Sequence, residues 1–316
     1  MSKLALVFPG QGSQIVGMGK DFYEKEEVFR NLLDKINELL DTPLKEKIFN
    51  GPAEQLKLTE NTQPAILAVS YGIYQVLLKK KILSKPDFVL GHSLGEYTAL
   101  LAAEAGTFEE FIPLVKNRGK FMQDAVPEGI GAMAAILGFD KEKIESLCWE
   151  EGGEENKLVV PANYNSPAQT VISGVKEAVE NVAKKAKELG ARRVIFLDVS
   201  APFHSTLMKK AADKLKIELD KINFNKLKYP IITNVDARIH DEIKDIPGLL
   251  YFQTFSPVRW EQSVNLLAEK GVTHFLEIGP GKTLSGLIRS TNSELKTFNV
   301  EKYADIDKLK DFLKDL

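Results

Sequence analysis

Short apolar runs alternate with longer segments of helical spacing in the first part of the chain. Residues 4–8 (LALVF) and 87–90 (DFVL) are predicted to be short buried strands. Apolar residues recur at helical intervals over residues 28–40, and residues 63–78 and 94–105 are predicted to form more apolar helices. A capping box, Thr107-x-x-Glu110, predicts the start of another helix. This alternation of strands and helices is typical of an α/β domain built on a parallel sheet.

The pattern changes after Pro127, where shorter elements follow one another in the order β-α-β-β-α-β. The predicted strands cover residues 132–137, 158–162, 170–173 and 193–197, and the predicted helices cover residues 141–149 and 176–189. This order is typical of a ferredoxin-like split βαβ unit. We therefore expect a small ferredoxin-like α+β subdomain at residues 128–198. It would be inserted into a large α/β hydrolase-like domain formed by residues 1–127 and 199–316.

The α/β pattern resumes beyond residue 200, with a helix predicted at residues 207–222 and strands at residues 231–233 and 274–278. The spacing of apolar residues from 306 to 316 predicts an amphipathic closing helix. Neither an internal repeat nor a low-complexity linker interrupts the sequence. The inserted subdomain is therefore expected to pack on the large domain rather than hang from it on loose tethers.

Composition narrows the functional classes. The 316 residues exceed the roughly 250–300 at which a single hydrophobic core stops growing, and they are 44% apolar and 27% charged. A net charge of −2 gives no reason to expect a nucleic acid partner. The only cysteine is Cys148, so a disulfide framework is impossible and a reducing, cytoplasmic location is expected. No apolar run approaches the ~20 residues of a membrane span, so no membrane association is expected.

Two glycine-rich turns resemble nucleotide-binding loops but have the wrong spacing. The turn at residues 10–12 would need a third glycine where Ile15 stands, and the P-loop-like turn at residues 281–283 would need its first glycine at Leu276. The sequence has no histidines at metal-ligand spacing, and a single cysteine cannot build a thiolate site. We therefore expect neither a metal nor a bound cofactor.

Residues 91–95 (GHSLG) follow a predicted strand and precede a predicted helix, as a nucleophile elbow does. In such an elbow the serine is held on a strained turn, so both flanking positions must be small. The following helix would direct free N–H groups and the positive end of its dipole at the group that Ser93 attacks. The alternative is that Ser93 only caps the helix, since serine is a favoured N-cap residue. The predicted flanking elements favour the nucleophile.

A nucleophilic serine needs a general base, and four histidines are available. His92 adjoins Ser93, but its side chain is expected to project away from the turn. His240 lies in a charged loop and His274 opens a predicted strand, so both are interpreted as structural. His204 follows a predicted strand and precedes a predicted helix, where a loop of the large domain could reach Ser93. Position alone therefore favours His204 as the base.

Together with further motifs, these residues resemble a known family, the malonyl-CoA:acyl carrier protein transacylases of fatty acid synthesis. The ordered matches run nearly from end to end: residues 8–14 (FPGQGSQ), 62–65 (TQPA), 91–96 (GHSLGE), 118–119 (RG), 163–167 (NYNSP), 203–205 (FHS), Gln253 with 256–260 (SPVRW), and 277–281 (EIGPG). No single match is specific, but their common order makes coincidence improbable.

The resemblance implies a role for each matching residue. Ser93 matches the nucleophile and His204 its general base. The main-chain carbonyl of Gln253 matches the group that orients the histidine, in place of an acidic residue. The backbone N–H groups of Gln11 and Leu94 match the oxyanion hole.

The resemblance also covers recognition. Arg118 matches the arginine that pairs with the malonyl carboxylate, a task that suits the planar guanidinium fork. Arg192 and Arg193 fall where relatives are thought to meet the carrier protein. Phe203, beside the base, is hypothesised to crowd an α-methyl branch and so to favour malonyl over methylmalonyl groups.

The resemblance implies a ping-pong acyl transfer from malonyl-CoA to holo-acyl carrier protein, with CoA as the leaving group and no other cofactor. Two alternatives stay open at this point. A serine esterase or lysophospholipase would use the same elbow, with an acidic residue such as Asp124 or Asp198 between serine and histidine in the chain. The other alternative is a non-catalytic module that only binds the carrier.

Overall fold

The apolar run at the start of the chain forms strand β1 (Lys3–Phe8), in the middle of the larger of two sheets. The structure is a computed structural model that describes residues 2–83, 85–152, 157–199, 201–314 and 316. Leu4 and Leu6 join a hydrophobic cluster on one face of the sheet, whereas Ala5 and Val7 join a second cluster on the other face. Because both faces are covered, every position of this strand can be apolar, as is usual in parallel sheets.

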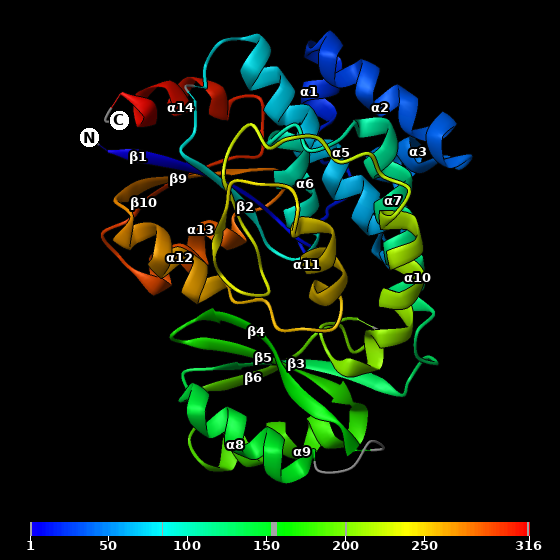
Figure 1. Cartoon of the computed structure of the whole chain (residues 1–316), viewed down its shortest axis with the longest axis vertical. Coiled ribbons are helices and arrows are strands. Elements are labelled where there is room, and N and C mark those ends of the chain that lie inside the picture. Colours follow the sequence, from blue (N-terminus) through cyan, green and yellow to red (C-terminus); the bar gives the residue numbers. More distant parts are fainter. Residues whose placement is uncertain (1, 84, 153–156, 200, 315) are drawn as a thin grey trace.

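Six strands form the larger sheet, in the order β10-β9-β1-β2-β7-β8 (Figure 1). Their bounds are β2 (Phe88–Gly91), β7 (Ile231–Ile232), β8 (Ile239–His240), β9 (Val272–Ile278) and β10 (Lys296–Val300). Neighbours run parallel except β7 and β8, which are antiparallel. Helices cover both faces, which confirms the α/β expectation. Because the parallel strands end at one edge, the loops after β1, β2 and β7 meet there, where open α/β sheets bind ligands.

The helices around this sheet include those that the apolar patterns predict and several shorter ones. Their bounds are α1 (Lys20–Lys25), α2 (Glu27–Leu40), α3 (Leu44–Asn50), α4 (Ala53–Lys57), α5 (Thr59–Lys79), α6 (Leu94–Ala102), α7 (Phe108–Gln123), α10 (Lys209–Leu219), α11 (Ile246–Gln253), α12 (Trp260–Glu269), α13 (Thr283–Thr291) and α14 (Asp305–Leu313). The predicted capping box is present at α7: the Glu110 N–H donates to Thr107 Oγ1 at 3.2 Å, and the Thr107 N–H donates to Glu110 Oε2 at 2.9 Å. The helix predicted at residues 207–222 instead begins with a 3-10 turn, η2 (Thr206–Met208), and ends at Leu219.

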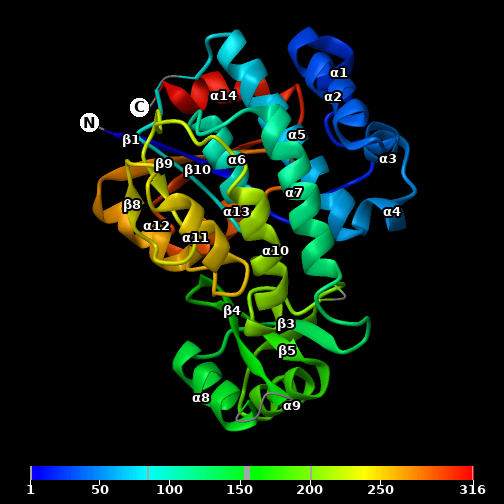
Figure 2. The same cartoon turned by 45° about the vertical axis from the view of Figure 1, so that its right-hand side comes forward.

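Four antiparallel strands form the smaller sheet, in the order β4-β5-β3-β6. Strands β3 (Gly131–Leu137), β4 (Val159–Ser166), β5 (Gln169–Val175) and β6 (Arg193–Phe196) alternate with α8 (Lys141–Glu151) and α9 (Lys176–Glu188) in the ferredoxin-like order. We call these elements the small lobe and the others the large lobe. Figure 2 shows α8 and α9 on the side of the smaller sheet that faces away from the large lobe. The division at residues 127/128 and 198/199 stays a prediction.

The small lobe packs on the large lobe along β4. The Val258 N–H of the large lobe donates to the Ala162 carbonyl at 2.8 Å, and the Tyr164 N–H donates to the Val258 carbonyl at 2.9 Å. Helices α7 and α10, which lead into and out of the small lobe, lie side by side in Figures 1 and 2. The lobes are therefore joined by backbone pairing as well as by the connecting chain.

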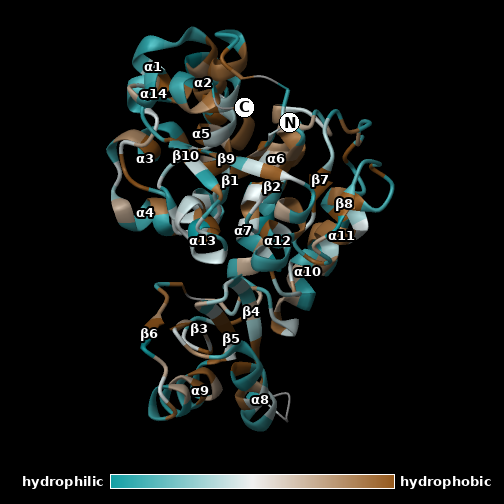
Figure 3. Cartoon of the chain, turned by 90° about the vertical axis from the view of Figure 1, so that its left-hand side faces the viewer, coloured by the Kyte–Doolittle hydropathy of each residue, from teal (hydrophilic) through white to brown (hydrophobic). Residues whose placement is uncertain are grey.

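Apolar residues form the core, whereas most ion pairs of the described residues lie at the surface, where each contributes about 0–1 kcal/mol. In Figure 3 the strands and inward helix faces are mostly brown or white, and the outer turns and loops are mostly teal. Within the described ranges, no helix combines the length and the apolar character that crossing a bilayer would require.

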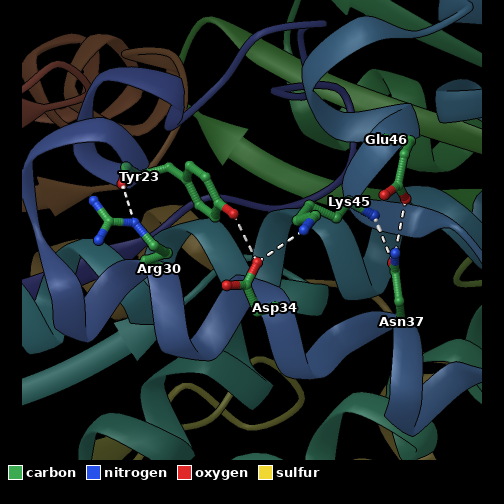
Figure 4. A network of polar contacts seen from close by, with 6 residues as sticks. All are labelled: Tyr23, Arg30, Asp34, Asn37, Lys45 and Glu46. Carbon is green, nitrogen blue, oxygen red and sulfur yellow. Dashed lines mark hydrogen bonds and ion pairs between the residues drawn. The ribbon is translucent and has the colours of Figure 1, made fainter.

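A polar network fixes α3 against α2 at the surface (Figure 4). Asp34 Oδ1 accepts hydrogen bonds from the Tyr23 hydroxyl and the Lys45 ammonium group, both at 2.8 Å. Asn37 Nδ2 donates to Glu46 Oε2 at 2.7 Å. Exposed pairs of this kind contribute about 0.2–1 kcal/mol each, so they orient these helices without driving folding.

Candidate active site

Ser93 lies on a sharp turn between β2 and α6, at the edge where the strands of the larger sheet end. Its backbone has φ 51° and ψ −106°, a strained conformation that costs about 1–3 kcal/mol for a residue other than glycine. The hydroxyl makes no capping hydrogen bond to the helix. It lies instead 2.8 Å from Nε2 of His204. The geometry therefore favours a nucleophile at this position over a helix cap.

The turn can be this tight only because glycine occupies positions 91 and 95, two residues before and two residues after Ser93. A Cβ atom at Gly91 would lie 1.9 Å from the carbonyl carbon of Gly95. A Cβ atom at Gly95 would lie 2.0 Å from the carbonyl oxygen of Phe8. Glycine thus lets α6 pack directly on the backbone of β1 and holds the elbow in place.

Replacing Gly95 with alanine is expected to lower the free energy of unfolding by about 3 kcal/mol, the upper end of the usual cost of overpacking, because α6 must move away from β1 to admit the methyl group. Gly286 in α13 is a matched control, since a Cβ atom there has no neighbour within 4 Å. Its replacement with alanine should raise stability by about 0.5–1 kcal/mol. Urea unfolding measures both changes, and equal effects in the two variants would contradict the tight packing at the elbow.

His204 is held by main-chain carbonyls on the side opposite Ser93. Its Nδ1 lies 2.9 Å from the carbonyl oxygen of Gln253 and 3.2 Å from that of Ser256. Carbonyl oxygens only accept hydrogen bonds, so Nδ1 carries the proton and Nε2 is free to accept the proton of the Ser93 hydroxyl. This arrangement gives a serine with a base in hydrogen-bond contact, which is the requirement for nucleophilic catalysis.

The aspartates that a serine hydrolase would need are engaged elsewhere. Asp124 forms an ion pair with Lys120 at 2.8 Å, and Asp198 forms one with Lys57 at 2.8 Å. In the described part of the chain, neither carboxylate contacts His204. Neither aspartate therefore occupies the position beside His204 Nδ1 that the acidic residue of an esterase would take.

Burial lowers the pKa of the base and of a neighbouring cation. Burial, and after it the positive charge of Arg118, lower the pKa of the His204 imidazole to about 3. The ring is therefore neutral near pH 7, the form that accepts a proton. Burial also lowers the pKa of the Arg118 guanidinium, but from an ordinary value so high that the group stays charged.

Arg118, from α7, is a cation that is only 1% exposed and has no ion pair among the described residues. Its guanidinium donates to Gln63 Oε1 at 2.7 Å, to Gln253 Oε1 at 2.8 Å and to the Ser93 hydroxyl at 3.2 Å, while its Nε has no partner. A buried charge is costly unless an opposite charge accompanies it. An arginine in this state beside a nucleophile is suited to bind an anionic group of a ligand.

A cavity of about 90 Å³ connects these groups. It is lined by residues from both lobes that include Gln11, Ser93, Leu94, Arg118, Phe203 and His204. Within the described residues, the N–H groups of Gln11 and Leu94 donate to no acceptor, so both are available to a developing oxyanion. Phe203 is 7% exposed and forms part of the wall next to the base.

Arg192 and Arg193 lie apart from this cavity, on the exposed edge where β6 follows α9. They border a surface hollow together with Lys184, Lys187 and Phe196. The structure therefore separates the predicted docking arginines from the other predicted site residues.

Two larger cavities adjoin the catalytic one. A cavity of about 600 Å³ shares Gln11, Leu197 and Val199 with it, and another of about 240 Å³ shares Gln11, His92 and Asn163. Both give a long, flexible ligand room to approach Ser93. In the described ranges, no group of three or more His, Cys, Asp or Glu side chains could hold a metal ion.

Sequence reasoning misses three buried polar residues of this site. Gln63 belongs to a matching motif but has no predicted role, yet it binds Arg118. Glu96 and Asn234 contact each other, and Asn234 also contacts the backbone of Ser93. The only sequence signal for Asn234 is its polarity directly after a predicted strand.

Comparison with known proteins agrees with this geometry. A model of the acyl transferase domain family matches residues 5–311. The malonyl CoA-acyl carrier protein transacylase of Bacillus subtilis (strain 168) is 50% identical over 300 residues, which are 95% of this chain and 94% of that protein. An acyl carrier protein S-malonyltransferase from Vibrio cholerae, solved as a crystal structure, is 42% identical with a TM-score of 0.94, covering 98% of this chain and 100% of its own.

A malonyl-transacylase solved in complex with its type II PKS acyl-carrier protein is equally similar. It is 42% identical with a TM-score of 0.94, and the match covers 98% of this chain and 100% of that chain. The chain that carries the elbow, His204 and the buried Arg118 is thus similar, over nearly its full length, to several malonyl transacylases. The chain belongs to the acyl transferase family and, within it, to the malonyl CoA-acyl carrier protein transacylases.

Proposed function

We propose that this chain transfers a malonyl group from malonyl-CoA to the phosphopantetheine thiol of acyl carrier protein, in fatty acid biosynthesis. The observation that carries the proposal is the buried Arg118, which forms no ion pair with any described residue, beside the Ser93–His204 pair in one cavity of about 90 Å³. A cavity of this size and charge suits a short acyl group that ends in a carboxylate.

In the first half of the reaction, His204 Nε2 takes the hydroxyl proton of Ser93 as the oxygen attacks the thioester carbon of malonyl-CoA. The carbonyl oxygen becomes an oxyanion, which the N–H groups of Gln11 and Leu94 stabilise. The carbon–sulfur bond then breaks, and His204 returns the proton to the departing CoA thiolate. The products are free CoA and a malonyl ester of Ser93.

The second half reverses these steps with a different thiol. His204 takes the proton of the phosphopantetheine thiol, whose sulfur attacks the ester carbon on Ser93. The carbon–oxygen bond breaks, and the proton passes to the serine oxygen. The reaction needs no metal and no bound cofactor, because CoA is only the leaving group of the first half.

Titration of His204 is expected to cause no loss of rate at low substrate concentration from pH 8 down to about pH 5, because His204 is already in its basic form. Among the described residues of the site, the one group whose pKa is raised into this range is Glu96, to about 7 by burial, so the Glu96→Gln variant is measured beside the native chain. With its pKa lowered to about 3, the imidazole gains a proton, and loses activity, only as the pH falls through that low value. The measurement is kcat/KM for malonyl-CoA across this range, with circular dichroism to confirm folding at each pH. A loss that begins near the ordinary histidine pKa of about 6.5 and persists in Glu96→Gln would contradict this charge state.

Phe203 is proposed to set the preference for an unbranched acyl group, since it forms the cavity wall beside His204. Replacing it with alanine, or more mildly with leucine, should raise the ratio of methylmalonyl to malonyl transfer by about tenfold or more. Competition between the two CoA esters measures this ratio. An unchanged ratio in both variants would disprove the role of Phe203.

The exposed Arg192 and Arg193, with Lys184 and Lys187 beside them, are proposed to dock an acidic carrier protein. The relative solved with its acyl-carrier protein makes a carrier partner reasonable for this chain. A cytoplasmic location is also part of the proposal, since the one free cysteine, Cys148, is buried and unpaired.

A transfer assay with matched carriers tests the proposed function. Malonyl-CoA and the chain should convert holo-carrier protein to the malonyl thioester, and apo-carrier protein, which lacks the thiol, should stay unmodified. Release of malonate at the same rate with and without holo-carrier would instead favour the hydrolase, and no reaction of either kind would favour a module that only binds the carrier.

A further inference from the structure

One buried side chain braces the elbow from the neighbouring strand. Asn234 lies two residues beyond β7, the strand that pairs with β2 in the larger sheet. It is 3% exposed and does not line the catalytic cavity. The steps proposed above give it no task, so its polar side chain needs another explanation.

The carboxamide of Asn234 bonds to the backbone on both sides of the strained turn. Its Oδ1 accepts a hydrogen bond from the Ser93 N–H at 2.6 Å, and its Nδ2 donates one to the Gly91 carbonyl at 2.7 Å. This pairing needs an acceptor and a donor on one short, planar group, which the asparagine carboxamide provides. The two bonds hold Ser93 at a positive φ that it would otherwise leave.

Asn234 is itself fixed by buried partners. Its N–H donates to Glu96 Oε2 at 3.0 Å, and its carbonyl accepts from the Arg259 N–H at 2.9 Å. Glu96 Oε2 also accepts from Gln253 Nε2 at 2.8 Å, and the same Nε2 donates to the Ser93 carbonyl at 3.0 Å. Because the carbonyl of Gln253 holds His204, one connected network positions both reacting side chains.

We propose that Asn234 is a positioning residue that aims the Ser93 hydroxyl, an inference that rests on the proposed acyl transfer. Since the Ser93 N–H is bound to Asn234, it is not available to an oxyanion. The oxyanion is left to the free N–H groups of Leu94 and Gln11. Asn234 therefore acts only through the backbone of the elbow and touches no substrate.

Two variants and a matched control test this role. Asn234→Ala removes both bonds, and Asn234→Asp keeps the acceptor for Ser93 but loses the donor to Gly91. We expect kcat to fall about 100-fold in Asn234→Ala while KM for malonyl-CoA changes less than about threefold, because the nucleophile is misplaced and Arg118 is not. Asn299 is the control, since its Nδ2 likewise donates to a glycine carbonyl, that of Gly281 at 2.7 Å, away from the elbow. Asn299→Ala should leave kcat unchanged.

The aspartate variant adds a readout that a purely structural role would not move. When protonated, the introduced carboxyl group can accept from Ser93 and donate to Gly91, as the native carboxamide does. The ratio of its kcat to the native kcat should therefore rise at least about tenfold between pH 8 and pH 5.5. The charged groups around position 234 are Glu96 on α6, Arg118 on α7, Asp236 and His240 at the β7–β8 hairpin, and Arg259 before α12. Burial raises the pKa of the Glu96 carboxyl to about 7, so the introduced carboxyl and Glu96 titrate as a pair, and the pair gains its proton as the pH falls through this range.

The proposal is overturned if Asn234→Ala and Asn299→Ala lower kcat equally, if KM alone changes, or if the ratio for Asn234→Asp is independent of pH. Should Asn234→Ala fail to fold, the pH response of Asn234→Asp decides. The native chain is measured in the same assay, so a failure of the proposed transfer itself appears as no malonyl transfer by the native protein.

Discussion

Replacing Arg118 with alanine is expected to lower kcat/KM for malonyl transfer by about 10²–10³-fold, and kcat/KM for acetyl transfer by less than about tenfold. Among the described residues that line the catalytic cavity, the Arg118 guanidinium is the only permanent positive charge. A fully desolvated carboxylate–arginine pair loses about 2–5 kcal/mol when one partner is removed. An acetyl group has no carboxylate for Arg118 to bind. Acetyl transfer by the variant is therefore slowed only by the loss of the hydrogen bonds that Arg118 makes to Ser93 and Gln253 within the site. Parallel assays with the two CoA esters measure the difference.

Arg118→Lys separates charge from geometry in the same assay. Lysine keeps the positive charge but cannot present the planar fork that binds a carboxylate with two bonds, so we expect an intermediate loss for malonyl transfer. Equal losses for malonyl and acetyl transfer in Arg118→Ala would contradict the assignment. They would reduce Arg118 to a structural partner of Gln63 and Gln253.

Replacing His204 with asparagine should lower kcat by about 10²–10⁴-fold, since general base catalysis contributes that much and both halves of the reaction use this imidazole. Asparagine is chosen because His204 has φ 59°, a left-handed conformation that asparagine tolerates better than most residues. The loss is measured by steady-state transfer and by single-turnover acylation of Ser93.

His240 provides the matched control for this variant. It is paired with Asp236 at 3.0 Å and lies outside the catalytic cavity, so His240→Asn should keep kcat within about twofold. A His204→Asn variant that keeps more than a tenth of the native kcat would contradict the assignment of His204 as the base.

The sequence predicts those elements whose signals are local. β1, β2 and β9 are short apolar runs, and α7 begins at a capping box, so each is recognised without knowledge of its neighbours. The start of α5 is not predicted, because Thr59, Asn61 and Thr62 are polar and buried against other parts of the large lobe. The edge strand β10 is also missed, since its positions are mostly half-buried and lack a clear alternation.

The site divides in the same way between local and tertiary signals. Ser93 is marked by Gly91 and Gly95, which the tight turn requires and which lie only two residues away from it on either side in the chain. Arg118 has no local signal, because a buried arginine on a helix looks like a surface arginine until its neighbours are known. Only the resemblance to a family pointed to it. Asn234 is 141 residues away from Ser93 in the chain, and the pairing of β7 with β2 alone brings them together.

The central claim is that Ser93 carries the malonyl group between two thiols, and intact-protein mass spectrometry tests it most directly. Malonyl-CoA should add one malonyl group to the native chain, peptide mapping should place it on Ser93, and Ser93→Ala should stay unmodified. The adduct should persist in buffer and disappear when holo-carrier protein is added. Absence of the adduct, its location on another residue, or its loss to water at the same rate without the carrier would contradict the account.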